Sequence, residues 1–509
     1  MNNPKNNNLI TVKSFKTIGI EAIPVNVEVS ITPGIGIHLV GLSDIAVKES
    51  LLRSVTALQA IGYKFPGSKV IINIAPSELI KTGQHYDLPI IIGIIAASGQ
   101  EYLPDLDKYI LAGEASLDGG LRMIDDGVCC ESIDLSDMKG IILPKRDALQ
   151  LAEATEGTVP AYGVDSIREV INILKGNIPN HTAYEEFLNQ PEKSPETLAF
   201  NSIASDGAAV RAAEIAASGG HGMVIIGPPG AGKSMIAKAV SELLPPMDKK
   251  QALECDKIRS ISSREILHGK RPFRTPHYSS SVSSMLGGGT GDTVRPGEVS
   301  LANGGVLFLD EYGLFPKALK EGLRGPLEDK KSVIARYRSK VEFPADFLPV
   351  IASSPCPCGY HGVGDRCTCT PTQIKLYLEK LGGPVFDRMD LQLYKIEIYK
   401  DGDKASYEDT CKKVLKAREK QKQRNGEGKL NADITATEIA LTLTDELRDF
   451  IEMLITRLGL SARAYTHMLR LARTIADLDG SDKIKTQHLA EASSYRFLDR
   501  NFLQGIKGE

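Results

Sequence analysis

A short apolar run, a glycine-rich loop and a helical pattern follow one another between residues 223 and 244, and this succession constrains the fold more than any other part of the chain. The loop has the form Gly227-x-x-x-x-Gly232-Lys233-Ser234. Its glycines let successive N–H groups point inward, and the helix that follows adds the positive end of its dipole. A chance glycine-rich loop would lack the strand before it and the helix after it. The succession therefore predicts a phosphate-binding loop in an α/β domain with a mostly parallel sheet.

The residues of this loop have separate expected tasks. Lys233 can reach the β- and γ-phosphates of ATP, and Ser234 can hold Mg²⁺. The segment predicted to bind the nucleotide comprises Gly227, Pro228, Pro229, Gly230, Ala231, Gly232, Lys233 and Ser234.

A second apolar run, 306–309, ends in Asp310 and Glu311. Asp310 is predicted to bind Mg²⁺ through water beside Ser234, and Glu311 to orient or deprotonate the attacking water. A strand that ends in Asp-Glu also occurs by chance. Its position after the phosphate loop and directly after Asn303-Gly-Gly305 favours the catalytic interpretation.

Length and charge bound what the chain can do. A chain of 509 residues has room for roughly two to four domains. The net charge of −3 means that no overall field attracts nucleic acid, so such contacts require local basic patches. The longest apolar run, 88–97, is too short to span a bilayer, and the N-terminus has no apolar signal region. We therefore expect a cytoplasmic protein without a membrane partner.

Composition and periodicity divide the chain into a first domain over 1–180, a linker over 181–199, a second domain over 200–398 and a helical domain over 399–509. In the first domain, strands are predicted at 25–31, 70–74, 110–114 and 140–144, and helices at 44–61 and 88–97. In the second, strands are predicted at 223–226, 305–309, 348–352 and 391–398. The last domain is predicted to contain helices at 408–424 and 444–458, a third capped by Ser461 and a fourth capped by Thr486.

Further motifs are spread over nearly the whole chain. They are Gly41-Leu-Ser-Asp44, Asp87-Leu-Pro89, Ala112-Gly-Glu-Ala-Ser-Leu-Asp118, Arg271-Pro-Phe-Arg-Thr-Pro-His277, Gly287-Gly-Gly289, Arg295-Pro-Gly-Glu298, Ala352-Ser-Ser-Pro-Cys-Pro-Cys-Gly-Tyr360, Gly383-Pro-Val-Phe-Asp-Arg-Met-Asp-Leu391 and Ser461-Ala-Arg-Ala-Tyr-Thr-His467. In this combination the chain resembles the YifB/ComM-type proteins, which belong to the magnesium-chelatase-like branch of the AAA+ ATPases.

The resemblance implies an AAA+ P-loop NTPase core with a C-terminal helical lid. It also implies a ring, usually a homo-hexamer, with each ATP at a subunit boundary. On this basis Arg388 is expected to be an arginine finger supplied to the neighbour's nucleotide, and Arg463 a sensor-2 arginine that reads the γ-phosphate from the lid. The alternatives are an Arg388 paired with Asp387 or Asp390, and an Arg463 on a solvated helix face.

The N-terminal domain resembles a Lon-protease-like, S5-like α+β fold. The segment Gly83-Gln-His-Tyr-Asp87 stands where a catalytic loop would be, and it contains no serine. Lys81 alone does not make a Ser/Lys dyad. We therefore predict a non-proteolytic domain that serves substrate contact or ring assembly.

One position departs from the family pattern. The family carries Asn at the sensor-1 position before Pro-Cys-Pro-Cys-Gly, and this chain has Ser354. A shorter side chain with a single hydroxyl is expected to orient the attacking water less well. The departure concerns the rate of hydrolysis more than nucleotide binding.

Two closely spaced cysteine pairs flank a glycine-rich loop. They are Cys356 with Cys358, and Cys367 with Cys369. Four thiolates suit tetrahedral Zn²⁺, which would stabilise a loop too poor in apolar residues to fold alone. The alternatives are that His361 replaces one ligand, or that the four cysteines are reduced and buried.

Residues 330–343 read as a hairpin that carries alternating basic residues. Arg336, Arg338 and Lys340 would share one face of a strand. The resemblance implies that such a hairpin projects into the central pore, where a ring of these residues would bind the DNA backbone. The alternative is a charged, solvated hairpin. The segment 257–274 is a second basic candidate, and its own alternative is a surface that forms salt bridges between subunits.

The sequence thus favours an ATP-driven ring motor acting on DNA. By resemblance, its task would be that of a ComM-like branch-migration helicase in recombination or natural transformation. One alternative is a protein-remodelling, chelatase-type ATPase. Another is an ATP-gated assembly protein with weak turnover.

Overall fold

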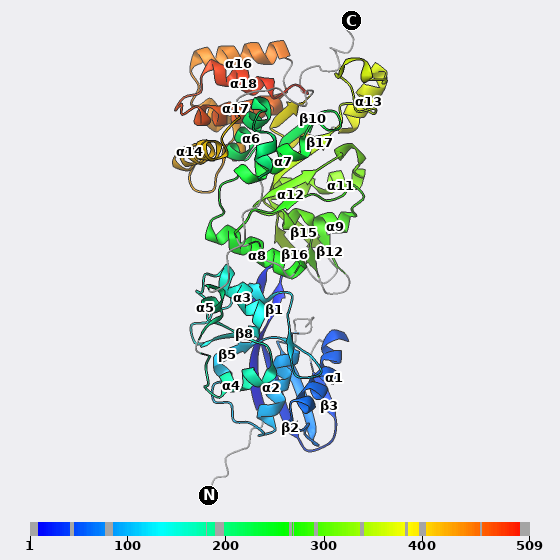
Figure 1. Cartoon of the computed structure of the whole chain (residues 1–509), viewed down its shortest axis with the longest axis vertical. Coiled ribbons are helices and arrows are strands. Elements are labelled where there is room, and N and C mark those ends of the chain that lie inside the picture. Colours follow the sequence, from blue (N-terminus) through cyan, green and yellow to red (C-terminus); the bar gives the residue numbers. More distant parts are fainter. Residues whose placement is uncertain are drawn as a thin grey trace.

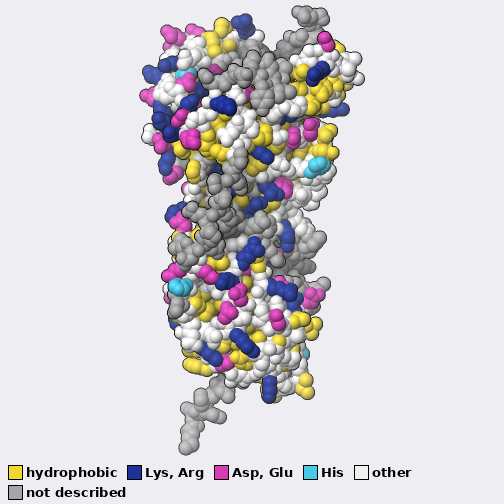
Figure 2. All heavy atoms as spheres, viewed as in Figure 1, with side chains coloured by type: hydrophobic (Ala, Val, Ile, Leu, Met, Phe, Trp, Pro, Cys, Tyr) yellow, Lys and Arg dark blue, Asp and Glu magenta, His cyan; other side chains and the backbone are white. Residues whose placement is uncertain are grey.

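The computed structural model describes residues 9–40, 45–76, 85–179, 181–188, 198–263, 267, 269–289, 294–335, 340–381, 385–395, 404–458 and 461–498. Along the long axis these residues form an N-terminal sheet with its helices, a second sheet that contains the phosphate loop, and a group of C-terminal helices (Figure 1). On the face shown in Figure 2, basic and acidic side chains are intermixed, as the small net charge leads one to expect.

The N-terminal sheet has seven strands in the order β3-β4-β2-β1-β5-β8-β9. Their bounds are β1 (Leu9–Ile18), β2 (Glu21–Thr32), β3 (Ile37–Val40), β4 (Lys69–Ala75), β5 (Tyr109–Leu111), β8 (Gly140–Pro144) and β9 (Ala161–Val164). The strand predicted at 25–31 lies within β2, where Val25, Val27 and Val29 are buried and every second side chain points away. The pairing is mixed, because β2 is antiparallel to both neighbours while β5, β8 and β9 are parallel.

Helices cover this sheet. They are α1 (Ile45–Ala60), α2 (Asp87–Ala97), α3 (Lys145–Ala154), α4 (Ile167–Leu174) and α5 (Ala183–Leu188), with 3₁₀ turns at Leu106–Lys108 and Gly127–Ser132 and a small hairpin of β6 (Glu114–Ala115) and β7 (Leu121–Arg122). The helices predicted at 44–61 and 88–97 are confirmed as α1 and α2. The strand β1 was not predicted from the sequence.

The second sheet has five parallel strands in the order β11-β14-β17-β10-β18. They are β10 (Met223–Ile226), β11 (Phe273–Arg274), β14 (Val306–Leu309), β17 (Leu348–Ser353) and β18 (Leu391–Tyr394). Alternate residues of these strands enter two separate cores: Ile225 packs with helices α6 (Gly207–Gly219) and α7 (Lys233–Leu243), whereas Val224 and Ile226 pack on the opposite face. The predicted parallel sheet with helices on both faces is confirmed.

The remaining elements of this region are shorter. The helices are α8 (Lys249–Ser263), α9 (Val282–Leu286), α10 (Glu298–Leu301), α11 (Lys317–Gly322), α12 (Arg324–Asp329) and α13 (Pro371–Leu381). The 3₁₀ turns are Ala199–Ser202, Tyr312–Leu314, Gly364–Arg366 and Phe386–Arg388. Two hairpins pair β12 (Gly287–Gly288) with β13 (Arg295–Pro296) and β15 (Lys331–Ala335) with β16 (Lys340–Pro344).

The C-terminal part is helical, as predicted. It comprises α14 (Tyr407–Asn425), a 3₁₀ turn at Asn431–Asp433, α15 (Ala436–Ala440), α16 (Asp445–Leu458), α17 (Ala462–Leu478) and α18 (Thr486–Ser494). Ser461 caps α17, since its hydroxyl accepts the N–H of Ala464 at 3.2 Å. Thr486 does not cap α18: Lys485 takes that place, because its N–H is accepted by His488 at 3.0 Å.

The N-terminal unit rests on α8 and on the β15–β16 hairpin. The buried ammonium of Lys257 on α8 lies 2.8 Å from the Ser132 hydroxyl and 2.9 Å from the Glu131 carboxylate. Ile20 packs against the apolar side of the hairpin. In the described part of the chain, no helix is both long and apolar enough to cross a bilayer.

Candidate functional site

Three strands of the second sheet bring their carboxyl ends to one edge, where ligands of parallel sheets usually bind. The phosphate loop follows β10, Asp310 follows β14, and Ser353 ends β17. The Ser234 hydroxyl lies 3.5 Å from a carboxylate oxygen of Asp310, and the N–H of Gly227 donates to the Ser353 carbonyl at 3.2 Å. The structure therefore brings together the two residues that the sequence assigned to Mg²⁺.

The glycines of the loop are required for different reasons. A Cβ on Gly227 would lie 2.4 Å from the carbonyl oxygen of Lys395, which is closer than any contact allows. Gly230 and Gly232 have φ values of +80° and +78°, in the left-handed region, and a Cβ on either would meet nothing within 4 Å. The space above these two residues is thus open.

Lys233 is almost fully buried at the first position of α7. Its ammonium donates to the carbonyls of Gly227 at 2.9 Å and Pro228 at 3.1 Å. Burial lowers the pKa of this ammonium, and the carboxylates of Glu311 and Asp310 oppose that shift. A phosphate group that entered the loop would therefore meet a cation already held beside both acids.

Glu311 has a backbone conformation that is uncommon for a residue with a side chain. Its φ is +50° and ψ is +45°, and its N–H donates to a carboxylate oxygen of Asp310 at 2.9 Å. Such left-handed residues cost free energy and collect at functional sites.

Ser354 follows β17 and is partly buried at the same edge of the sheet. The hydroxyl of its neighbour Ser353 lies 3.2 Å from that of Tyr377 on α13. Burial raises the pKa of Tyr377, the nearby Ser353 opposes that shift, and the negative Glu311 adds to it. Tyr377 therefore stands close to the acidic pair, a position that the sequence did not reveal.

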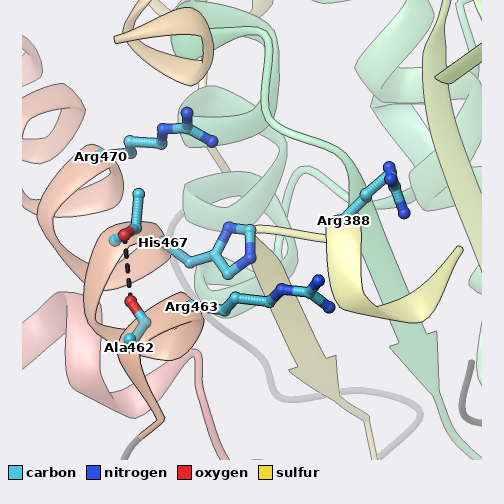
Figure 3. Close-up of a pocket in the computed structure, with 6 residues that line it drawn as sticks. Arg388, Ala462, Arg463, His467 and Arg470 are labelled. Atoms are coloured by element: carbon cyan, nitrogen blue, oxygen red, sulfur yellow. Dashed lines mark hydrogen bonds between the residues drawn. The ribbon is translucent and has the colours of Figure 1, made fainter. Parts of the chain in front are cut away.

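Arg388 and Arg463 line one pocket of about 380 Å³ together with Ala462, Thr466, His467 and Arg470. Figure 3 shows the side chains of Arg463 and His467 extending from α17 toward the turn that carries Arg388. The described residues that line this pocket include none from the phosphate loop. The two arginines thus lie together in a pocket that no described residue of the phosphate loop lines.

The guanidinium of Arg388 is a quarter exposed and forms an ion pair with Glu328 of α12. Burial and the neighbouring guanidiniums of Arg324 and Arg463 lower its pKa despite that carboxylate. Asp390, one of the partners considered from the sequence, is instead bound by two histidines. Arginines packed this closely favour an anion between them.

The four cysteines converge. The sulfur atoms of Cys356, Cys358, Cys367 and Cys369 all lie within 4.8 Å of one another. Three of the separations are 3.3, 3.8 and 3.7 Å. Zinc–sulfur bonds of about 2.3 Å in a tetrahedron place sulfurs about 3.8 Å apart, so this set fits Zn²⁺.

The surroundings of this cluster affect its thiols differently, since burial raises the pKa of Cys369 to about 12. Backbone N–H groups of Tyr360 and Thr368 lower the pKa of Cys358 to about 6. His361 supplies its backbone N–H to the Cys356 sulfur at 3.3 Å and is not one of the four converging groups. The set is therefore four cysteines rather than three with His361.

The predicted hairpin is confirmed as β15 and β16, but only one of its three candidate basic residues can be placed. Arg336 and Arg338 lie outside the described residues. Lys340 is exposed and pairs with Glu342 at 2.8 Å, which raises the pKa of the lysine.

Basic side chains of the second basic segment, 257–274, form their contacts within the chain. Lys257 contacts Glu131 and Ser132, and Arg271 donates to the carbonyls of Pro245 and Gly304. Arg274 forms a two-point ion pair with Glu298 at 2.7 and 2.8 Å. We therefore do not retain 257–274 as a nucleic-acid candidate, although Arg264 lies outside the described residues.

In the N-terminal sheet, Lys81 and Gly83 lie outside the described residues. The buried Asp87 carboxylate accepts the Ser50 hydroxyl, the Arg53 guanidinium and the N–H of Ala115. These contacts give Asp87 a structural role between α1 and α2.

Sequence reasoning missed a buried polar cluster beside the arginine pocket. The carboxylate of Asp390 contacts His221, which precedes β10, and His467 of α17. The sequence signal that could have indicated this cluster was Asp390 itself, an aspartate between apolar residues at the start of a predicted strand. Its partners lie 169 and 77 positions away, so no local pattern joins them.

Comparison with known proteins gives matches over most of the chain. Residues 27–147 match the profile described as subunit ChlI of Mg-chelatase, residues 199–402 that of magnesium chelatase, subunit ChlI, and residues 404–496 that of the ChlI C-terminal part. The uncharacterised protein YifB of Escherichia coli is 38% identical over 97% of this chain and 98% of its own length. Competence protein ComM of Haemophilus influenzae is 36% identical over the same shares.

Proposed function

Since this chain belongs to the YifB/ComM-type branch of the magnesium-chelatase-like AAA+ ATPases, we propose that it is an ATP-driven ring motor that acts on DNA. The observation that carries the ATPase part is the contact between Ser234 and Asp310 at the carboxyl edge of a parallel sheet, beside Lys233 and Glu311. The DNA part rests on the relatives and on the hairpin.

Each residue at this edge has one task in the proposed reaction. The amides of the loop and the Lys233 ammonium bind the β- and γ-phosphates, after Lys233 exchanges its carbonyl partners for phosphate oxygens. Ser234 and Asp310 would hold Mg²⁺, which neutralises charge on the phosphates when bound. Glu311 accepts a proton from the attacking water, and Ser354 helps to orient that water.

We assign Arg388 and Arg463 jointly to the ATP of an adjacent subunit. Their shared pocket, which no described residue of the same chain's phosphate loop lines, supports this assignment. A pair of guanidiniums would neutralise charge that develops on the γ-phosphoryl oxygens, an effect worth about 10³–10⁵ in rate for related arginines. The proposal requires a ring or filament, and a homo-hexamer is the form we expect.

DNA as the substrate is supported by the relative named competence protein and by the hairpin, on which the described Lys331 and Lys340 are exposed. We propose branch migration or helicase work, with Arg336, Arg338 and Lys340 on the DNA backbone.

The test is ATP turnover with single-stranded, duplex and branched DNA. We expect stimulation by DNA, and we expect the triple alanine variant of the three hairpin residues to lose it and to show a smaller salt dependence of DNA affinity. Lys331→Ala on the same hairpin is the matched control, because Lys331 is also exposed and also faces Glu342. Equal behaviour of the two variants would remove the hairpin from the proposal.

A chelatase-type remodelling function is the second candidate, supported by the profile of the magnesium chelatase subunit. Turnover that ignores every DNA substrate would favour it. An ATP-gated assembly protein is the third candidate, supported by Ser354 in place of asparagine. It predicts nucleotide-dependent particle size with little hydrolysis, and Ser354→Asn would then raise turnover.

We also propose that the four-cysteine cluster holds structural Zn²⁺. The loop it closes contacts the nucleotide site, because a Cβ on Gly359 would lie 3.1 Å from the Pro229 ring. We expect one zinc per chain in the wild type and none in Cys356→Ser. Cys411→Ser, outside the cluster, should leave the zinc content unchanged. Equal zinc in wild type and Cys356→Ser would refute the assignment.

A further inference from the structure

We propose that Asp390 is a positioning residue for ATP hydrolysis: it holds the turn of Arg388 and the helix of Arg463 at a fixed spacing. The inference rests on the proposed function, in which both arginines act on the ATP of an adjacent subunit. Asp390 itself does not face the pocket; it acts through the histidines that bind it. We call Asp390, His221 and His467 the Asp390 clamp.

The clamp joins three parts of the fold. Asp390 precedes β18 and follows Arg388 by two residues. His221 lies between α6 and β10, and His467 lies on the lid helix α17. One carboxylate therefore ties the β10–β18 side of the second sheet to the lid helix.

The contacts are close and buried. The Nδ1 of His221 lies 2.6 Å from Oδ2 of Asp390, and the Nδ1 of His467 contacts Oδ1. Burial by itself would raise the pKa of Asp390, but the hydrogen bonds from both histidines outweigh it and hold the pKa well below its usual range. Without both histidines, the negative charge of the buried Asp390 carboxylate would be uncompensated. The two contacts therefore fix the distance between the turn before β18 and the lid helix α17.

Outer contacts hold the clamp in turn. The Nε2 of His221 lies 2.7 Å from the Thr474 hydroxyl on α17, and Asn431 donates to that hydroxyl at 3.0 Å. Arg496 donates to the carbonyls of Met389 and Asp390 at 2.6 and 2.9 Å. The backbone next to Arg388 is thus braced from the lid and from the C-terminal segment.

The clamp also touches the arginine pocket. His467 lines that pocket and lies one helical turn after Arg463, on the same face of α17. A shift of α17 relative to the turn before β18 would separate the two guanidiniums, since Arg463 lies on α17 and Arg388 lies in that turn. Misplacement by about 1 Å is enough to cost roughly 10²-fold in rate when catalytic groups must converge.

The first experiment measures ATP turnover and nucleotide affinity of the ring. We expect Asp390→Asn to lower kcat by about 10- to 100-fold and to leave the affinity of the subunit's own loop for a fluorescent ATP analogue within about twofold. His467→Asn keeps an N–H near the place of Nδ1 and should retain most of kcat, whereas His467→Ala should not. Equal losses in the two His467 variants, or a loss of nucleotide affinity, would mean a merely structural role.

The second experiment mixes variant subunits. A ring of Asp390→Asn and Glu311→Gln subunits in equal amounts should recover about a quarter of wild-type turnover, because random neighbours pair an intact Glu311 with an intact clamp at one boundary in four. Each variant alone should be inactive or nearly so.

A mixture of Arg388→Ala with Glu311→Gln separates the two proposals. Recovery in this mixture but not in the Asp390→Asn mixture overturns the clamp and leaves the shared site intact. Recovery in neither mixture overturns the assignment of the arginines to an adjacent subunit. Should Asp390→Asn not fold, His467→Ala takes its place in the mixture.

Discussion

Gly227 and Gly230 belong to the same loop, and a methyl group is unfavourable at each position for a different reason. Gly227 faces the Lys395 carbonyl with no room for a side chain, while Gly230 has open space and a left-handed backbone. Steric exclusion by backbone cannot relax, whereas a strained φ is a fixed and smaller cost.

We therefore expect Gly227→Ala to lower the free energy of unfolding by about 3 kcal/mol and to abolish ATP binding. Gly230→Ala should cost only about 1–2 kcal/mol, since it carries the cost of positive φ alone. Denaturant unfolding of both variants, with and without ATP analogue, checks this. A milder effect at Gly227 than at Gly230 would contradict the packing at the Lys395 carbonyl.

Asp256 on α8 is a buried carboxyl group whose protonation affects the stability of the fold. Burial raises its pKa to about 6, although the Leu267 N–H donates to it at 2.7 Å. The folded chain thus binds this proton more tightly than the unfolded chain, so the stabilising effect of protonation is lost as the pH rises through about 6.

Asp256→Asn should accordingly raise the free energy of unfolding by the order of 1–3 kcal/mol at pH 8 and leave it nearly unchanged near pH 4. Asp449→Asn, at an exposed position of α16, is the control and should show no such trend. Thermal unfolding of both variants across this pH range is the measurement. A benefit that is constant with pH would disprove the buried carboxyl.

Two helices of the C-terminal part begin with a serine cap. Ser406 and Ser461 cap α14 and α17 in the same way, by accepting a backbone N–H from the third residue of the helix. Only α17 carries a pocket arginine, Arg463, in its first turn. The cap thus fixes the place from which that side chain starts.

Ser406→Ala and Ser461→Ala should each cost about 1 kcal/mol of stability, the usual value for a lost cap. Only Ser461→Ala should also lower kcat, by several-fold, because fraying of the first turn displaces Arg463. Melting temperature and steady-state ATPase rate distinguish the two effects. Equal kcat in both variants would show that the first turn of α17 is not needed for turnover.

At the scale of the whole molecule, α8 links the N-terminal sheet to the ATPase core. Lys257 is buried between Glu131 and Ser132, while Lys249 on the same helix forms an exposed pair with Glu156. Removing the buried Lys257 loses its packing and its contacts with the partly exposed Glu131 and with Ser132, whereas exposed pairs contribute little.

Lys257→Ala is therefore expected to lower stability by about 2–3 kcal/mol and to split thermal unfolding into two transitions. Lys249→Ala should unfold like the wild type. Calorimetry and limited proteolysis across the contact check this. A single unchanged transition in Lys257→Ala would mean that the two units are held together by other contacts.

Many helices and strands could be predicted from the sequence, because their patterns lie within a single segment of the chain. The strands predicted at 223–226 and 348–352, the helices α2, α14 and α16, and the Ser461 cap follow from periodicity and end signals within one segment. Strand β1 was missed. The domain boundaries at 180, 199 and 398 and the roles of the site residues stay predictions.

The sequence by itself determined the phosphate loop and the cysteine set, because each lies within one short stretch of chain whose residues meet by local geometry. Only the tertiary structure decided that Arg388 and Arg463 share a pocket and that Asp390 lies between His221 and His467. Those residues meet because β18, α17 and the turn before β10 pack together. Contacts between distant segments depend on how all the elements pack, and no spacing along a single chain records that.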